Sequence, residues 1–413
     1  MVTGVSRRLS TFQLARGMAG ATPTPDPRDV ATLSCSAPPA LPPNPSPAAA
    51  FAAVVAPTVA VAGAVMNSDD AFNAVLARDL PGWASKPGQL SRADVDKRVV
   101  DAKITGDDAA ALAVVAEGFD DLAKANQGAF VTLADFEKVK LGHKFEENQN
   151  VLKTAAYDHL NGPLDYKALQ QGDVGDCYFL SALDDEVRFH PDRVAGWSEK
   201  NADGSCTITF PYRFVSPQRV TSPTETEICL HASSGANGTW ATDYETAWEN
   251  ALHPGTGRKG EDGQDPVLGI QAVTGHDASD EEIPSVALAD IHKQLTDAFA
   301  DPTNPKIVEV STYDAPSPNH KPQDGPTRTY TNGLIDGHAY SLQGYDPKTR
   351  LVTIRNPWGS NPPSDAVKDL GNGEFQYTLA QMIDQFEMLT METDKPAPAP
   401  TPSPVADHAK KVA

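Results

Sequence analysis

The sequence predicts an α+β fold in which helical segments come first along the chain and strands follow. Two observations predict it. Apolar residues between about 67 and 145 recur at three- and four-residue steps, which is the pattern of a buried helix face. From about 207 onward, short apolar runs alternate with Gly- and Pro-rich turns, which is the pattern of strands. With 413 residues, the chain is long enough for two or three domains.

The two ends of the chain differ in composition from the rest. Residues 1–66 are rich in Ala, Pro, Ser and Thr, and 393–413 form a second Pro-rich stretch. Such sequences bury too little apolar surface to offset chain entropy, so we expect both to be disordered. The uncharged run 48–66 is interpreted as a low-complexity linker, with a membrane or secretion segment as the alternative. A cytoplasmic location is therefore favoured, and secretion or membrane association through 1–66 stays open.

Residues 67–149 are predicted to form a helical region that resembles a degenerate EF-hand pair. Leu90 precedes Asp94 by four places, and Val131 precedes Asp135 by the same spacing, as in the exit half of an EF-hand loop. The entry half before Leu90 has Trp, Ser and Pro where ligating Asp or Asn would stand. We therefore expect a structural helical pair rather than a calcium site. The predicted buried positions are Leu76, Leu80, Val95, Val99, Val100, Leu112, Val115, Phe119, Leu122 and Phe136.

Charge and cysteine content argue against several functions. The net charge is −21, and contacts to phosphates need a basic face, so nucleic-acid binding is not expected. The four cysteines include no Cys-x-x-Cys pair, so they do not suggest zinc. Cys206 and Cys229 lie in strand-like runs. They either pair across a sheet or remain two buried thiols.

Residues 150–392 are predicted to form two lobes, at about 150–276 and 277–392. Helices are expected around 177–189 and 243–252. The predicted strands are Thr207–Phe214, Glu227–His231, Ile307–Thr312, His338–Tyr345 and Leu351–Arg355.

Cys177 is the first candidate catalytic residue. Glycines at 172 and 175 loosen the chain just before an apolar helical run, which places Cys177 in the first turn of a helix. There the helix dipole and the free backbone N–H groups favour a thiolate. Gln171, six residues upstream, is placed to direct its amide at an oxyanion beside the Cys177 backbone N–H. On its own, this segment also fits a buried helical cysteine.

His338 and Asn356 are the partners that a thiol nucleophile needs. His338 starts one predicted strand, and Asn356 ends the next, just before a Pro-Trp-Gly turn. An imidazole takes the thiol proton, and the Asn carbonyl holds the tautomer and orientation of that imidazole. Trp358 would cover the His–Asn hydrogen bond and keep water off it. The order Cys, His, Asn and the spacings resemble those of papain-like peptidases.

The segments at 171–177 (Gln-Gly-x-x-Gly-Asp-Cys), 337–341 (Gly-His-Ala-Tyr-Ser) and 355–359 (Arg-Asn-Pro-Trp-Gly) carry a more specific likeness. They resemble the three signature segments of the calpain family of cysteine endopeptidases. The resemblance covers about 150–392. Weaker similarities lie at 240–252, 268–275 and 373–386.

The resemblance implies a papain-like core of two lobes, with an extended substrate bound in the cleft. It implies limited proteolysis of protein or peptide substrates. In this reaction the Cys177 thiolate attacks a peptide carbonyl, an acyl-enzyme forms, and His338 serves as base and then acid. Gly337 would bring backbone close to the peptide. The alternatives are a catalytically silent calpain-like binding protein and a papain-like acyltransferase or deamidase.

Two positions depart from the family pattern without removing a catalytic group. Tyr178 stands where a Trp usually follows the nucleophile, and Gln376 stands where the closing strand usually has a Trp. We expect neither a regulatory small subunit nor the modules that follow the core in animal calpains. The sequence predicts no oligomeric state.

Calcium is a cofactor that the resemblance implies, although the residues themselves assign no metal ligands. Two acidic stretches are candidates, and a solvated surface is the alternative for both. They are Glu261, Asp262 and Asp265 in the first, and Asp277, Asp280, Glu281 and Glu282 in the second.

Overall fold

The computed structural model describes residues 67–154, 164–172, 174–231, 239–252, 263–316 and 327–399. The predicted disorder of 1–66 lies outside these residues, as does 400–413 of the predicted tail. Strand β10 (Phe386–Pro396) runs past residue 393, so the ordered chain extends further than predicted. Among the described residues, no helix has both the length and the apolar character needed to cross a membrane.

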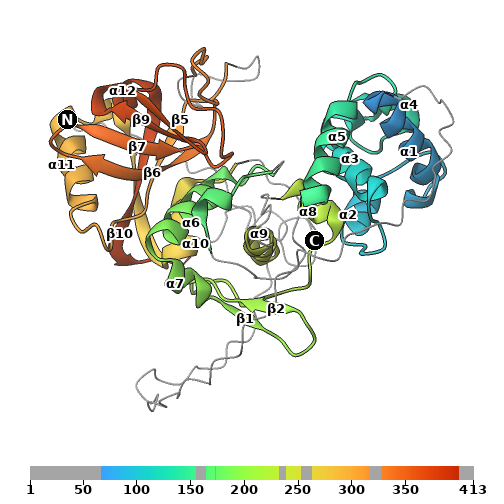
Figure 1. Cartoon of the computed structure of the whole chain (residues 1–413), viewed down its shortest axis with the longest axis horizontal. Helices are drawn as coiled ribbons and strands as arrows, with labels where there is room; N and C mark the ends of the chain where they lie inside the picture. Colours follow the sequence, from blue (N-terminus) through green and yellow to red (C-terminus); the bar gives the residue numbers. More distant parts are fainter. Residues whose placement is uncertain are drawn as a thin grey trace, which may run out of the picture. The chain divides into compact units, whose positions relative to one another are not determined.

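The predicted α+β class is confirmed, and the helical part comes first (Figure 1). Its helices share one hydrophobic core, which holds most of the predicted buried positions. Val100 is the exception, because it follows α2 and is 54% exposed. Helix α5 runs through the predicted boundary at 149. The elements are α1 (Ser68–Trp83), α2 (Arg92–Val99), α3 (Asp107–Ala123), η1 (Lys124–Asn126), α4 (Leu133–Phe136) and α5 (Gly142–Thr154).

Backbone pairing joins the two loops that the sequence singles out in this region. Leu90 and Val131 exchange N–H···O hydrogen bonds of 3.0 and 2.9 Å. Immediately after them, Ser91 and Thr132 start α2 and α4, each with a capping box completed by the Asp three places on. The two repeats therefore form equivalent local structures.

The strand predicted at 227–231 is wrong, because these residues belong mainly to helix α8 (Glu225–Leu230). Thr224 and Glu227 form a capping box at its start, which is the signal that the sequence does contain. The apolar run Ile-Cys-Leu at 228–230 is too short for its period to distinguish a helix from a strand.

The disulfide alternative for Cys206 and Cys229 is also excluded. Cys206 lies in β2 (Cys206–Ile208), inside the core around Cys177, whereas Cys229 of α8 packs in the core of the amino-terminal helices. Both are buried thiols that form no disulfide. Of the predicted strand 207–214, only Thr207 and Ile208 lie in β2.

The first part of the region 150–392 combines helices with a small antiparallel sheet of order β1-β2-β3. Aromatic residues of α6 and α9 stack in its core, where the rings of Phe179 and Trp248 lie 5.4 Å apart. The elements are η2 (Tyr166–Ala168), α6 (Cys177–Phe189), α7 (Pro191–Ala195), β1 (Ser198–Lys200), β2, β3 (Gln218–Val220), α8, α9 (Trp240–Leu252) and α10 (Pro266–Thr274).

The second part is a seven-stranded antiparallel sheet of order β4-β10-β5-β6-β7-β9-β8. The predicted strands at 307–312, 338–345 and 351–355 correspond to β5, β6 and β7. The elements are β4 (His276–Glu282), η4 (Ile283–Ser285), α11 (Leu288–Ala298), β5 (Val308–Thr312), β6 (Ala339–Asp346), β7 (Leu351–Arg355), β8 (Lys368–Gly371), β9 (Glu374–Thr378), α12 (Leu379–Gln385) and β10.

The two faces of this sheet have opposite chemistry, because side chains alternate along each strand. One face is apolar: Tyr340 and Leu342 of β6 pack in a core that includes residues of α11 and α12. The other face meets α6 and is polar. In Figure 1, α6 and α10 lie on the side of the sheet away from α11. The polar residues of this face are Glu309, Ser341, Gln343 and Arg355, all buried.

Asp184 joins α6 to the polar face of the sheet. Its Oδ1 lies 3.0 Å from Nη1 of Arg355, and both side chains are fully buried. Its Oδ2 accepts hydrogen bonds from Ser341 Oγ (3.0 Å) and Gln343 Nε2 (2.6 Å). Burial outweighs the attraction of Arg355 and raises the pKa of Asp184 to about 6. A charge-paired junction therefore holds the helix of Cys177 against the strands of His338 and Asn356.

Removing one member of this pair should be costly. We expect Asp184→Ala to lower the free energy of unfolding by about 3–5 kcal/mol, because Arg355 stays buried without its counter-charge. The measurement is urea denaturation. Asp297→Ala, which breaks the exposed Lys293–Asp297 pair on α11, serves as the control and should unfold like the wild type. Equal, small effects of both substitutions would contradict a stabilising role for the junction.

Candidate active site

Cys177 is the first residue of α6, as the sequence predicts. Its side chain is 7% exposed and lines a cavity of about 710 Å³. Behind it, the indole N–H of Trp248 donates to the hydroxyl of Tyr178 at 3.0 Å. Tyr178 is therefore held by a buried hydrogen bond.

His338 and Asn356 come together because β6 and β7 are adjacent antiparallel strands. His338 immediately precedes β6, and Asn356 immediately follows β7. The register pairs Ser341 with Arg355, so the start of one strand lies beside the end of the other. The result is a hydrogen bond of 3.0 Å between His338 Nε2 and Asn356 Oδ1.

The hydrogen bonds around Asn356 determine the tautomer of His338. Asn356 Oδ1 also accepts from the backbone N–H of Trp358 at 3.0 Å, which fixes the orientation of the amide. An amide oxygen only accepts, so Nε2 of His338 carries a hydrogen. In the neutral imidazole, Nδ1 is then the atom that accepts a proton. This is the atom that a general base needs.

Aromatic rings enclose the imidazole of His338. The ring of Trp358 lies 5.1 Å from it at a tilt of 55°, and the ring of Tyr340 packs edge-on at 4.9 Å. Both the histidine and Asn356 are buried. The predicted shielding residue Trp358 thus lies against the imidazole, in a place where it limits the access of water.

Five of the six predicted site residues line the same cavity. They are Gln171, Cys177, Gly337, His338 and Trp358. Asn356 lies behind His338. Gly337 has a φ of +58°, which favours glycine, and its N–H donates to the carbonyl of Tyr313 at 2.9 Å.

Gln171 lies beside Cys177, but its side-chain N–H group is engaged within its own loop. Nε2 donates to the carbonyl of Val174 at 2.6 Å. The backbone N–H of Gln171 donates to the carbonyl of Pro357 at 2.8 Å, which ties this loop to the turn after Asn356. Because Nε2 carries two hydrogens, this single bond leaves one donor for the predicted oxyanion role.

Cys177 and His338 are both held in their neutral forms. Burial raises the pKa of the Cys177 thiol to about 12, although the backbone N–H groups of Ala339 and Tyr178 favour the thiolate. Burial also lowers the pKa of His338 to about 4. No hydrogen bond joins Cys177 Sγ to His338 in the described part of the chain. Both shifts favour a neutral thiol and a neutral imidazole over an ion pair.

Among the described residues, the two acidic stretches that are candidates for calcium contribute to no cluster of metal-ligand atoms. Asp265 is the N-cap of α10 and accepts the backbone N–H of Val267. Glu261 and Asp262 lie outside the described residues. The stretch predicted as an acidic loop forms strand β4, whose side chains alternate between two faces. Within that strand, Asp280 accepts from Thr390 Oγ1 at 2.7 Å.

The residues that hold Asn356 and the loop of Gln171 in place through buried contacts are not predicted from the sequence. Arg355 lies in the segment 355–359, but no sequence pattern near it predicts its buried partner Asp184. Arg355 also donates from Nη2 to the carbonyl of Leu169 at 2.7 Å, next to the loop of Gln171. Gly373 is another such residue, because its carbonyl accepts the Asn356 N–H at 3.0 Å.

The chain matches no protein-family model, and no curated protein matches it.

The close packing of Gly373 against the Asn356 turn predicts a specific steric effect. A Cβ at Gly373 would lie 2.7 Å from the Asn356 carbonyl oxygen, whereas one at Gly371 would meet open space. Both have positive φ, so backbone strain is common to the two substitutions. We expect Gly373→Ala to lower the free energy of unfolding by about 1–3 kcal/mol more than Gly371→Ala, measured by urea denaturation. Equal losses would contradict the steric account.

The low pKa of His338 predicts a pH dependence of stability. Its pKa is about 4 in the folded protein against an ordinary 6.5, so unfolding takes up a proton between these pH values. The stabilising contribution is complete above about pH 6.5 and is lost as pH falls through about 4. Between neutral pH and about pH 4, the free energy of unfolding of the wild type should fall by on the order of 3 kcal/mol more than that of His338→Gln.

The measurement is the free energy of unfolding of both proteins across this pH range. The carboxyl groups titrate in both proteins, so the difference between the two curves gives the contribution of His338. Parallel curves would contradict the buried, neutral histidine.

Proposed function

We propose that the protein is a calpain-like cysteine endopeptidase that hydrolyses peptide bonds of protein substrates by limited proteolysis. The observation that carries the proposal is the buried hydrogen bond from His338 to Asn356 in the wall of a cavity that also contains Cys177. This bond leaves Nδ1 of the imidazole as the proton acceptor. A nucleophile, a base and a residue that orients the base are thereby present together.

The local environment of each group supports its proposed chemical role. Cys177 has the N-terminus of α6 beside it, where backbone N–H groups favour a thiolate and can stabilise an oxyanion. On substrate binding, Nδ1 of His338 takes the thiol proton as Sγ attacks the peptide carbonyl. His338 then donates this proton to the leaving amine, and water hydrolyses the acyl-enzyme.

The neutral state of the two groups is consistent with a resting enzyme. Proton transfer requires Cys177 Sγ and His338 Nδ1 to come within hydrogen-bond distance. The thiol and the imidazole sit on different elements, at the start of α6 and next to β6, so a rotation of the Cys177 side chain would change their separation without moving the helix against the sheet. The second hydrogen of Gln171 Nε2 would complete the oxyanion site.

The arrangement of the described elements supports two finer parts of the proposal. The papain-like division assigns Cys177 to the helical lobe and His338 and Asn356 to the β-rich lobe. An EF-hand-like origin of 67–149 is supported by the backbone pairing of Leu90 with Val131. In that region Asp94 and Asp135 accept hydrogen bonds at helix starts, so we propose a structural rather than a calcium-binding role.

The proposal predicts that activity depends on one thiol. We expect Cys177→Ala to lower cleavage of casein at least about 10³-fold, because the nucleophile is removed. Cys206→Ala removes an equally buried thiol that lies outside the cavity, and this control should keep its activity. The measurement is the release of peptides, with and without calcium and with a chelator, which also tests the calcium requirement.

Covalent labelling of the thiol distinguishes a peptidase from a catalytically silent binding protein. A thiol-reactive peptidyl epoxide should add once to the wild type and not to Cys177→Ala, as detected by mass spectrometry. Cleavage that persists unchanged in Cys177→Ala would contradict the assignment of Cys177 as the nucleophile. A wild type that neither cleaves nor reacts, with or without calcium, would instead indicate a binding role.

A further inference from the structure

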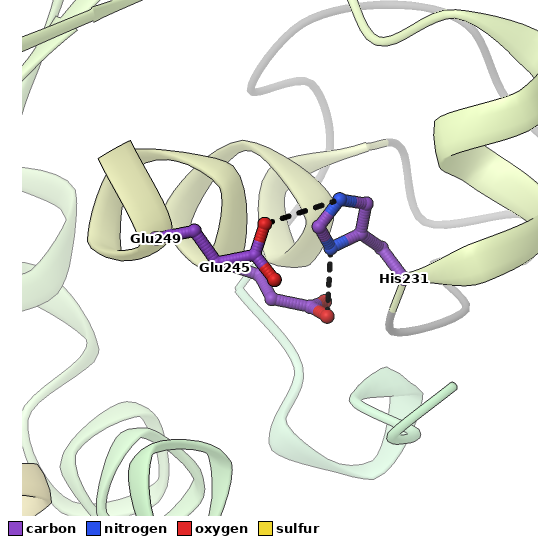
Figure 2. Close-up of side chains that lie close together, drawn as sticks. All are labelled: His231, Glu245 and Glu249. Carbon is purple, nitrogen blue, oxygen red and sulfur yellow. Dashed lines mark ion pairs between the residues drawn. The ribbon is translucent and has the colours of Figure 1, made fainter. Parts of the chain in front are cut away.

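A histidine and two glutamates come together away from the catalytic cavity (Figure 2). His231 directly follows α8, and Glu245 and Glu249 lie one turn apart on α9, so both project from the same face of that helix. Nδ1 of His231 lies 2.7 Å from Oε1 of Glu245, and its Nε2 lies 4.0 Å from Oε2 of Glu249. In Figure 2 the imidazole ring lies between the two carboxylates.

This cluster is almost completely removed from water. The exposed fractions of the three side chains are 1% for His231, 0% for Glu245 and 14% for Glu249. Nδ1 of His231 is close to a carboxylate oxygen but forms no hydrogen bond with suitable geometry among the described residues. A buried polar atom in this position is costly unless another group satisfies it.

We propose that His231, Glu245 and Glu249 bind a divalent transition-metal ion of the zinc class. One ring nitrogen and one oxygen from each glutamate lie within 4.8 Å of one another. Zinc holds nitrogen and oxygen ligands at about 2.0–2.2 Å, which separates tetrahedral ligands by roughly 3.4 Å. Rotation of Glu249, the most exposed of the three, brings the third ligand to this spacing.

The ligand types select against calcium. Calcium takes oxygen ligands, usually six to eight of them, whereas an imidazole with two carboxylates suits zinc and its neighbours. Three protein ligands leave a fourth position for water. The site needs no cysteine, which is why the cysteine spacing in the sequence does not reveal it.

The position of the cluster suggests what the ion does. A Cβ at Gly172 would lie 2.4 Å from the carbonyl oxygen of Leu230 and 2.5 Å from that of His231, so the chain at 230–231 packs directly against the loop next to Gln171. An ion that ties His231 to α9 would hold this segment in place beside the catalytic cavity. Metal binding itself does not depend on the proposed peptidase activity.

The test is zinc binding by the full-length protein after treatment with a chelator, measured by isothermal titration calorimetry with zinc chloride. We expect the wild type to bind one equivalent and to gain thermal stability on binding. Glu249→Gln should weaken this binding at least about tenfold, since changes even beyond the direct ligands typically cost that much. His231→Gln should have the same effect or a larger one.

The control is His190→Gln. His190 also lies against a buried carboxylate, at 3.0 Å from Oε2 of Glu186, but there Arg193 supplies the positive charge and lies 2.9 Å from Oε1. This variant should bind zinc like the wild type. Glu249→Gln changes the least buried ligand, so it keeps the test valid if His231→Gln fails to fold.

Three outcomes would overturn the proposal. They are the absence of saturable zinc binding by the wild type, equal binding by Glu249→Gln and His190→Gln, and calcium chloride binding this cluster in preference to zinc. The first outcome would identify the cluster as a histidine held between two carboxylates only. One equivalent of zinc lost in both ligand variants and kept in the control supports the site.

Discussion

The buried contact between Asp184 and Arg355 is the constraint on which the candidate site depends. Asp184 lies two turns after Cys177 on α6, and Arg355 immediately precedes Asn356 at the end of β7. One ion pair therefore links the helix that begins with Cys177 to the strand that precedes Asn356. Because both charges are out of water, any movement that separates them exposes an unpaired charge in a poorly polarisable environment. The relative position of helix and sheet is thus strongly restrained.

The same junction explains how a polar site exists inside a protein core. Alternation along β5, β6 and β7 sends apolar side chains toward α11 and α12 and polar ones toward α6. Part of this polar face is satisfied by hydrogen bonds across the junction, from Ser341 and Gln343 to Asp184, whereas both carboxylate oxygens of Glu309 have no hydrogen-bond partner among the described residues. The cost of burial remains visible at the reactive groups. It raises the pKa of the Cys177 thiol and lowers that of His338, so the pair stays neutral until their contact changes.

The sequence predicts an element well when the residues that cause it lie within a few positions of it along the chain. Strand β7 coincides with the predicted 351–355, and α6 with the predicted 177–189, because each has a clear pattern with Gly or Pro nearby. Helix α8 is missed because three apolar residues have no readable period, and only the capping box at Thr224 marks it. The acidic stretch at 277–282 is predicted as a loop because of its charged residues, but it forms a strand that pairs with β10.

The sequence by itself determined the chemical identity and order of Cys177, His338 and Asn356, and their positions at the ends of helix or strand. These depend on residue type and on near neighbours along the chain. Only the tertiary structure decided the pKa shifts of the thiol and imidazole and the meeting of His231 with Glu245 and Glu249. Each of these depends on desolvation and close packing. Both arise between segments far apart in the sequence, so no local pattern encodes them.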